Sequence, residues 1–290
     1  MTVIPNDLPE SRRNRIPTPI MSVLVKPTLV LAIVWLVLAI FVALFAPLLA
    51  THSPTAQVPW DVLMPPSAQY LLGTDDLGRD VFSRQIFGTQ PTLLGVLIAI
   101  GTATVIGVPW GLISGYVGGW VDLTLMRFVD ALLVFPGLIL TLALTSALGA
   151  SLQSTMFSLG IVYSPLVARV VRVGVLSVRN RDYVQITRMF GSSTMYRIFN
   201  HVLPSVLSAT VVQLTLLCGL SVLAQTGLNF LGLGVPNPNP SWGSSVAETF
   251  RYIMIDPMAP VLPGLIVVFT VLSIYRVGDE VRDRLEIQAR

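Results

Sequence analysis

The sequence contains very little charge. Asp, Glu, Lys and Arg make up 11% of its 290 residues, and hydrophobic residues make up 53%. Soluble domains carry about 25% charged residues. A chain this apolar has too few polar side chains to cover its surface in water, so its composition excludes an ordinary soluble domain. It predicts an integral membrane protein instead.

Residues that commonly carry chemistry are also scarce. The chain has one cysteine, Cys218, two histidines, His52 and His201, and one lysine, Lys26. A single cysteine cannot form an internal disulfide, and it has no partner with which to build a metal site. No G-x-x-x-x-G-K-[ST] loop is present to hold a nucleotide phosphate. Ser, His and Asp occur at no spacing typical of a catalytic site, so we expect a chain that is not an enzyme.

Apolar stretches are numerous enough to cross a bilayer six times. A spanning helix needs roughly 20 mostly apolar residues. The charge-free window 131–168 is too long for one helix, and its break at 149–154 separates a third span from a fourth. The sequence therefore predicts an all-α membrane fold with six spans, at 28–50, about 91–116, about 122–148, about 155–176, 203 to about 234, and about 258–275.

Basic residues are unevenly divided between the two sides that these spans define. With the N-terminus inside, fifteen Lys and Arg residues are cytoplasmic, and only Arg79, Arg84 and Arg251 lie outside. Basic residues favour the cytoplasmic side. We therefore predict that both termini, and the basic segment 181–205, are cytoplasmic.

The predicted spans carry no ionisable residue near their middle. Arg127 and Asp130 lie close to the cytoplasmic end of the third span, where we interpret them as a boundary ion pair. Proton relays within membranes use acids or histidines in the spans. The chain is therefore passive or structural, or another chain supplies its energy.

The segment 181–205 is predicted to form two short helices around a turn. Gly191 suits the turn because glycine accepts positive φ, and Ser192 or Ser193 can cap the second helix. Pro204 fits the first turn of the fifth span. Periodicity alone leaves open whether this is an ordinary interfacial loop or a docking element. Apolar residues share one face on either side of Gly191, namely Tyr183, Ile186 and Phe190 before it, and Met195, Ile198, Phe199 and Val202 after it.

The spacing of this segment resembles the EAA loop of ABC importer permeases, a cytoplasmic helix that docks into a groove on an ATPase subunit. Gly191 and Leu203-Pro204 match its anchors, Gln-Ile-Thr at 185–187 replaces Glu-Ala-Ala, and His201 replaces Ile. The resemblance implies that the residues which couple the chain to an ATPase are Asp182, Tyr183, Gln185, Ile186, Thr187, Phe190, Gly191, Ser192, Ile198, His201 and Pro204.

A second stretch, LGTDDLGRDVFSR at 72–84, is similar to the segment before the second span in the dipeptide/oligopeptide branch of these permeases. Further matching pieces occur in the same order, at 126–136, 180–184, 230–234, 240–243 and 278–283. The resemblance covers roughly residues 29–285. The residues of the 72–84 motif are Gly73, Thr74, Asp75, Gly78, Arg79, Asp80, Ser83 and Arg84.

The resemblance implies a type I ABC importer permease fold with cytoplasmic coupling helices. The implied function is that of one of two permease subunits in an ATP-driven importer of dipeptides or oligopeptides in the bacterial cytoplasmic membrane. The implied partners are a sister permease, one or two ATPase subunits that bind ATP and Mg²⁺, an extracytoplasmic substrate-binding protein and the lipid bilayer. No nucleic acid, and no cofactor in this chain, is expected. Two alternatives stay open, an importer of nickel chelates or another small solute, and a non-transporting membrane scaffold.

The same interpretation predicts how the chain is organised. An external loop at 234–258 is expected to meet the binding protein, or to carry an aromatic belt at the membrane surface. The predicted parts are a cytoplasmic tail at 1–27, a first transmembrane helix at 28–50, an extracytoplasmic segment with the GTDDLGRD motif at 51–90, a five-helix core at 91–278 with a coupling loop at 179–202, and a cytoplasmic tail at 279–290.

Small residues recur along the predicted second span. Gly107, Gly111 and Gly115 are spaced four apart, so they lie on one helical face. Such a face lets two helix backbones approach closely. We therefore predict that a neighbouring helix packs against these three glycines.

A polar stripe runs along one face of the predicted fifth span, formed by Cys218, Ser221, Gln225 and Asn229. Polar side chains are costly against lipid, so this face is expected to meet protein or water. Two interpretations stay open. The stripe lines the translocation pathway and contacts a peptide backbone, or it joins helices through hydrogen bonds.

Overall fold

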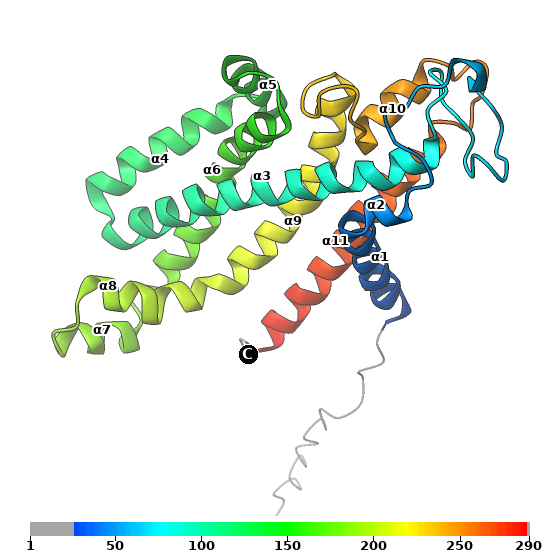
Figure 1. Cartoon of the computed structure of the whole chain (residues 1–290). Coiled ribbons are helices and arrows are strands. Elements are labelled where there is room, and N and C mark those ends of the chain that lie inside the picture. Colours follow the sequence, from blue (N-terminus) through cyan, green and yellow to red (C-terminus); the bar gives the residue numbers. More distant parts are fainter. Residues whose placement is uncertain (1–25, 289–290) are drawn as a thin grey trace, which may run out of the picture.

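The computed structural model describes residues 26–288, and the regular structure over that range is helical (Figure 1). The elements are α1 Pro27–Leu44, α2 Ala46–Leu49, η1 Pro59–Asp61, α3 Val81–Val117, α4 Gly119–Val134, α5 Gly137–Leu148, α6 Leu152–Val178, α7 Asp182–Met189, α8 Thr194–Arg197, the π-helix η2 Ile198–Val202, α9 Leu203–Phe230, α10 Trp242–Phe250 and α11 Val261–Gln288. Five helical stretches are long and apolar enough to cross a membrane, and α4 with α5 makes a sixth if that bent pair is one span. The all-α membrane fold is therefore confirmed. Most of the predicted N-terminal tail, residues 1–25, lies outside the described residues.

Helix α3 begins at Val81, well before the predicted start of the second span near Pro91. Asp80 caps its first turn, because the Asp80 side chain accepts a hydrogen bond from the backbone N–H of Ser83. The helix then continues through Pro91 and Pro109. It therefore extends into the segment that precedes the predicted span.

The predicted third span, 122–148, is not one straight helix, which corrects the sequence-based expectation. Its two parts, α4 and α5, are bent by 95° at the break between them. Pro136 disfavours helical backbone at the residue before it, and Phe135 is accordingly extended, with φ −78° and ψ 137°. Helix α5 then packs against α6.

The most extensive contact between helices joins α3 to α6. A Cβ atom on Gly107 would lie 2.6 Å from the carbonyl oxygen of Ser164, and one on Gly111 would lie 2.5 Å from that of Ala168. Gly115 is equally crowded by α6. The predicted packing of a helix against these three glycines is therefore confirmed.

Helices α3, α6 and α9 pack against one another, and the main apolar core lies where they meet. Valines dominate the face of α6 that enters the core. Outward-facing residues such as Leu31 and Val105 are exposed, as suits helices surrounded by lipid. The buried members of the core are Ala103, Leu112, Val167, Val171, Val175, Val202, Val206 and Leu217.

The predicted ion pair between Arg127 and Asp130 is wrong, because Asp130 pairs with a different arginine. Asp130 of α4 lies 2.6 Å from Arg169 of α6 and not against Arg127 of its own helix. Three residues further along α6, Arg172 donates two 2.6 Å hydrogen bonds to Asp122 of α4. Because α4 runs beside α6, these acids are used to join the two helices.

The glycine face of α3 leads to a testable prediction. Gly111→Val should clash with a backbone carbonyl that cannot move aside, and should lower the free energy of unfolding by about 1–3 kcal/mol. Gly101→Val is the matched control, because Gly101 lies on the exposed side of the same helix with no atom within 4 Å of its Cβ position. Thermal unfolding of both variants in detergent measures the difference. Equal midpoints would contradict tight α3–α6 packing at this position.

Candidate functional site

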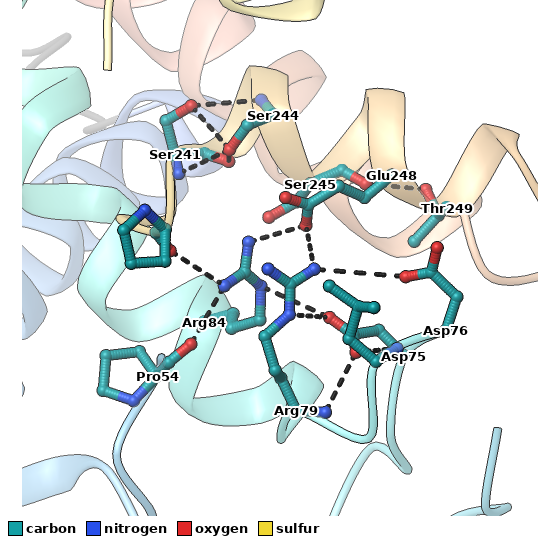
Figure 2. A network of polar contacts seen from close by, with 12 residues as sticks. Pro54, Asp75, Asp76, Arg79, Arg84, Ser241, Ser244, Ser245, Glu248 and Thr249 are labelled. Atoms are coloured by element: carbon teal, nitrogen blue, oxygen red, sulfur yellow. Dashed lines mark hydrogen bonds and ion pairs between the residues drawn. The ribbon is translucent and has the colours of Figure 1, made fainter. Parts of the chain in front are cut away.

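A buried cluster of charged side chains joins the motif at 72–84 to helix α10, as Figure 2 shows. The Arg79 guanidinium lies 2.6 Å from the Asp75 carboxylate and 3.1 Å from the Glu248 carboxylate. Arg84 lies 2.6 Å from the same Glu248 oxygen. All four side chains are at most 10% exposed. Two cations thus face two anions away from water, where a charge without a partner is very costly.

The motif builds part of this geometry locally. The Asp75 carboxylate accepts hydrogen bonds from the backbone N–H groups of Leu77 and Arg79, both at 2.9 Å. Gly73 and Gly78 have φ of +74° and +70°. Backbone carbonyls of the preceding loop occupy the space that a Cβ would need at both positions. Both glycines are therefore required by the turn and by the close approach of this loop.

The remaining motif residues fix the start of α3. The Asp80 carboxylate accepts hydrogen bonds from the hydroxyls of Ser83 at 2.6 Å and Thr51 at 2.8 Å. The Thr74 hydroxyl accepts one from the N–H of Met64 at 2.8 Å. The structure therefore brings all eight predicted motif residues together, and they hold the preceding loop onto α3.

Sequence reasoning missed Glu248, which contacts both arginines. Glu248 lies on α10, which the buried Trp242 fastens to α3 by donating a 3.3 Å hydrogen bond to the carbonyl of Gln85. The sequence offered one weak signal for Glu248, namely that it is the only acidic residue between Asp182 and Asp256. Nothing in the sequence alone relates it to arginines more than 160 residues away.

The cluster serves as an anchor. Both of its buried carboxylates, Asp75 and Glu248, are engaged by arginines. Near them, Tyr252 is 6% exposed. Burial, and then the negative charges of Asp75 and Asp76, raise the pKa of the Tyr252 phenol above its ordinary value, so it stays neutral. These groups tie two segments together and are not arranged to transfer protons.

At the far end of the fold, the segment 181–205 forms the predicted short helix and turn (Figure 1). Helix α7 ends in a Schellman motif: the N–H of Gly191 bonds to the carbonyl of Arg188 at 3.0 Å, and the N–H of Ser192 bonds to that of Thr187 at 3.2 Å. Gly191 has φ +75°. The predicted positive φ is therefore confirmed, and the space around Gly191 is open in this chain.

Large apolar side chains are exposed on α7 and at its C-cap. Ile186 is 50% exposed, Met189 87% and Phe190 86%, whereas Val184 on the opposite face is buried. Sequence reasoning included Ile186 and Phe190 in the coupling set but missed Met189. Large apolar side chains that stand this far out of a helix form a surface suited to a partner.

The second half of the segment runs into the membrane without a break. Ser193 caps α8, accepting a hydrogen bond from the N–H of Tyr196 at 3.2 Å. Helices α8, η2 and α9 then form one continuous stretch through Pro204. The His201 ring lies between those of Tyr183 and Tyr196, with centroids 6.4 and 5.7 Å away. Tyr183 therefore packs back onto this helix as well as facing outward.

Other predicted coupling residues have varied surroundings. Asp182 and Gln185 are exposed on α7. The Thr187 hydroxyl donates to the carbonyl of Val184 at 2.8 Å, and Ile198 packs against the main core. Their contact with an ATPase stays a prediction.

The polar stripe on α9 lies inside the chain. Ser221, Gln225 and Asn229 are at most 5% exposed, and Cys218 is partly buried. The Gln225 amide donates a 2.9 Å hydrogen bond to the carbonyl of Pro91 on α3. The Asn229 side-chain oxygen accepts a 3.1 Å hydrogen bond from the backbone N–H of Val235, in the loop after α9. In this conformation the stripe joins α9 to α3 and to that loop, and its role as a pathway lining stays a prediction.

Comparison with known proteins identifies the family. Residues 107–286 match the profile described as "Binding-protein-dependent transport system inner membrane component". This chain belongs to that family. It is therefore a multi-pass inner-membrane protein and a transport subunit, not a catalytic one. A system of this kind also includes a binding protein and an ATPase.

Individual relatives are similar along most of the chain. It is 37% identical to the dipeptide transport system permease protein DppC of Alkalihalophilus pseudofirmus, over 88% of this chain and 85% of that protein. It is 38% identical to the probable D,D-dipeptide transport system permease protein DdpC of Escherichia coli, over 91% and 88%. An inward-facing structure of the MetNI methionine ABC transporter matches the fold with a TM-score of 0.57 at 20% identity, covering 68% of this chain and 94% of that one.

The ion cluster of this permease component leads to a second prediction. Glu248→Gln should leave two buried guanidinium groups without their shared anion, at a cost of about 3–5 kcal/mol in the free energy of unfolding. Asp256→Asn is the control, because Asp256 is an exposed acid in the same region of the chain. Protease cleavage within residues 51–80, and thermal unfolding in detergent, report the loss. The cluster is not an anchor if both variants behave like the native protein.

Proposed function

We propose that this chain is one of two permease subunits of an ATP-driven importer of dipeptides or oligopeptides. The observation that carries this proposal is its similarity, over about nine-tenths of its length, to permeases named for dipeptide transport. Support also comes from three residues of the 72–84 motif, Asp75, Arg79 and Arg84, which are buried together in one ion cluster. A sister permease would supply the other half of the translocation pathway.

The proposed orientation puts both termini in the cytoplasm. Lys26, at the start of α1, lies 3.9 Å from Asp283, near the end of α11. The Arg276 side chain of α11 also donates a 3.1 Å hydrogen bond to Thr28. These contacts support a topology in which both ends of the chain lie on one side of the membrane. The excess of basic residues favours the cytoplasm for that side.

In this orientation α7 is the coupling helix. Its exposed side chains Ile186, Met189 and Phe190 would enter a groove on the ATPase, and burying each would contribute roughly 1.5–3 kcal/mol. ATP and Mg²⁺ would be bound by the ATPase subunits. At the opposite end, the exposed side chains Trp60 and Met254 would face the extracytoplasmic binding protein.

The test is uptake into proteoliposomes that contain the chain, its sister permease, the ATPases and the binding protein. A labelled dipeptide should accumulate only when ATP is supplied on the ATPase side. A nickel chelate is the competing substrate, and accumulation of the chelate in place of the dipeptide would reject the peptide assignment. Dipeptide entry without the ATPases would reject an ATP-driven importer.

The same assay tests the coupling helix through Gly191. Gly191→Val should strain the turn at φ +75°, lowering uptake and ATPase co-purification together. Gly191→Asn is the matched control, because asparagine tolerates positive φ. If Gly191→Asn has native activity, glycine is needed at this position for the conformation of the turn. If both variants lose activity, glycine is needed because the ATPase approaches closely. Normal uptake by Gly191→Val would show that α7 is not the coupling helix.

A further inference from the structure

A cavity of about 490 Å³ lies behind the coupling helix, between the end of α3, the end of α6, α7 and α8. Three arginines line it, Arg179, Arg188 and Arg197, together with the amide side chains of Asn180 and Gln185. No aspartate or glutamate is among its lining residues. The cavity therefore holds three positive charges and several hydrogen-bond donors with no negative charge in its wall.

Two of these arginines are held in place by neutral groups. Arg197 is 8% exposed, and its guanidinium donates to the hydroxyls of Tyr116 at 2.9 Å and Thr194 at 3.0 Å. Arg179 donates to the carbonyl of Gly115 at 2.7 Å. These hydrogen bonds orient the guanidinium groups without supplying a counter-ion to the buried Arg197, whereas Arg179 also interacts electrostatically with the carboxylate of Asp122. A buried charge without a counter-ion is unfavourable, so the site favours an anion.

Among residues 26–285, no acidic side chain fills this need. Arg188, in the last turn of α7, makes no ion pair with any described residue in 26–288. Asp122, on α4 near this end of α3, is already engaged by Arg172 in two 2.6 Å hydrogen bonds. Asp182 begins α7 but is not part of the cavity wall. The anion is therefore expected from outside the part of the chain that the structure describes.

We propose that this cavity binds a phosphate group, and that an anionic phospholipid headgroup supplies it. Guanidinium groups match phosphate oxygens in pairs, which makes arginine well suited to phosphate. The spans α3 and α6 end at Val117 and Val178, next to the lining residues Tyr116 and Arg179. The cavity thus lies where membrane helices end, at the level of headgroups, and basic pockets between helices on the cytoplasmic side bind anionic lipids.

The site connects the coupling helix to the membrane-spanning helices. Arg188 comes from α7, Arg179 from the end of α6, and Arg197 from α8. A phosphate held by all three would neutralise their mutual repulsion and draw α7 toward the ends of the spans. The cytoplasmic location rests on the orientation proposed above, but the anion site itself does not.

The test is a titration of the purified full-length chain in a neutral detergent, with binding read by native mass spectrometry. The probes are short-chain phosphatidylglycerol, phosphatidylcholine and inorganic phosphate. Arg188→Gln removes one charge without breaking an internal contact, and should weaken phosphatidylglycerol binding about tenfold. Arg188→Lys should retain part of the affinity. Arg181→Gln is the matched control, because Arg181 is an exposed arginine of the same segment that does not line the cavity, and it should bind like the native chain.

Each outcome is decisive. Stronger binding of phosphatidylglycerol than of phosphatidylcholine, lost in Arg188→Gln only, supports the lipid phosphate. If inorganic phosphate displaces phosphatidylglycerol equally well, the cavity is a phosphate site whose ligand is a soluble phosphate and not a lipid headgroup. The proposal is overturned if the two lipids bind alike, or if Arg188→Gln matches Arg181→Gln. It is also overturned if Arg188→Gln lowers ATPase co-purification alone, since an acidic side chain of the ATPase would then occupy the cavity.

A failure of the proposed import function can be distinguished from a failure of the lipid-binding proposal. Binding is measured on this chain without its partners, so absent peptide uptake leaves the lipid result unchanged. Labelling of the control position Arg181→Cys from the external side would reject the cytoplasmic orientation while the anion site stands.

Discussion

The close backbone contact between α3 and α6 is the constraint on which the rest of the structure depends. Gly111 brings α3 against a carbonyl of α6 at a distance that no larger residue allows. Helix α3 begins in the ion cluster, where Asp80 and Arg84 fix its first turn. Helix α6 ends at Val178, and α7 begins shortly afterwards at Asp182. One tightly packed helix pair therefore connects the ion cluster to the proposed coupling segment.

Charge is concentrated at the two ends of this pair and handled differently at each. At one end, Arg79 and Arg84 are balanced by Asp75 and Glu248 within the chain, so the loops there are held firmly. At the other end, the buried Arg197 is oriented by the neutral hydroxyls of Tyr116 and Thr194. Charges that are balanced internally suit an end that is held rigid, and a buried arginine with neutral partners suits an end that binds other molecules.

Local signals in the sequence predicted much of this fold. Apolar runs predicted the spans, glycine spacing predicted that some neighbouring helix packs closely on α3, and Gly191 predicted the turn after α7. Features that depend on which helices become neighbours were not predictable. Spacing within one helix favoured an Arg127–Asp130 pair, whereas the fold brings Arg169 beside Asp130. The apolar character of 122–148 is continuous across Pro136, so hydropathy did not reveal the bend between α4 and α5. Glu248 lies too far along the chain from the 72–84 motif for the sequence to link them.

Cross-linking from two exposed methionines tests most directly whether α7 is the part that meets an ATPase. Met189 on α7 is 87% exposed and Met254, in the region after α10, is 95% exposed. In a Cys218→Ser background, Met189→Cys and Met254→Cys would each be treated with a thiol-to-amine cross-linker in the assembled transporter. The account predicts that the ATPase is captured through Met189→Cys and not through Met254→Cys. Capture through Met254→Cys, or none through Met189→Cys in an intact complex, would contradict it.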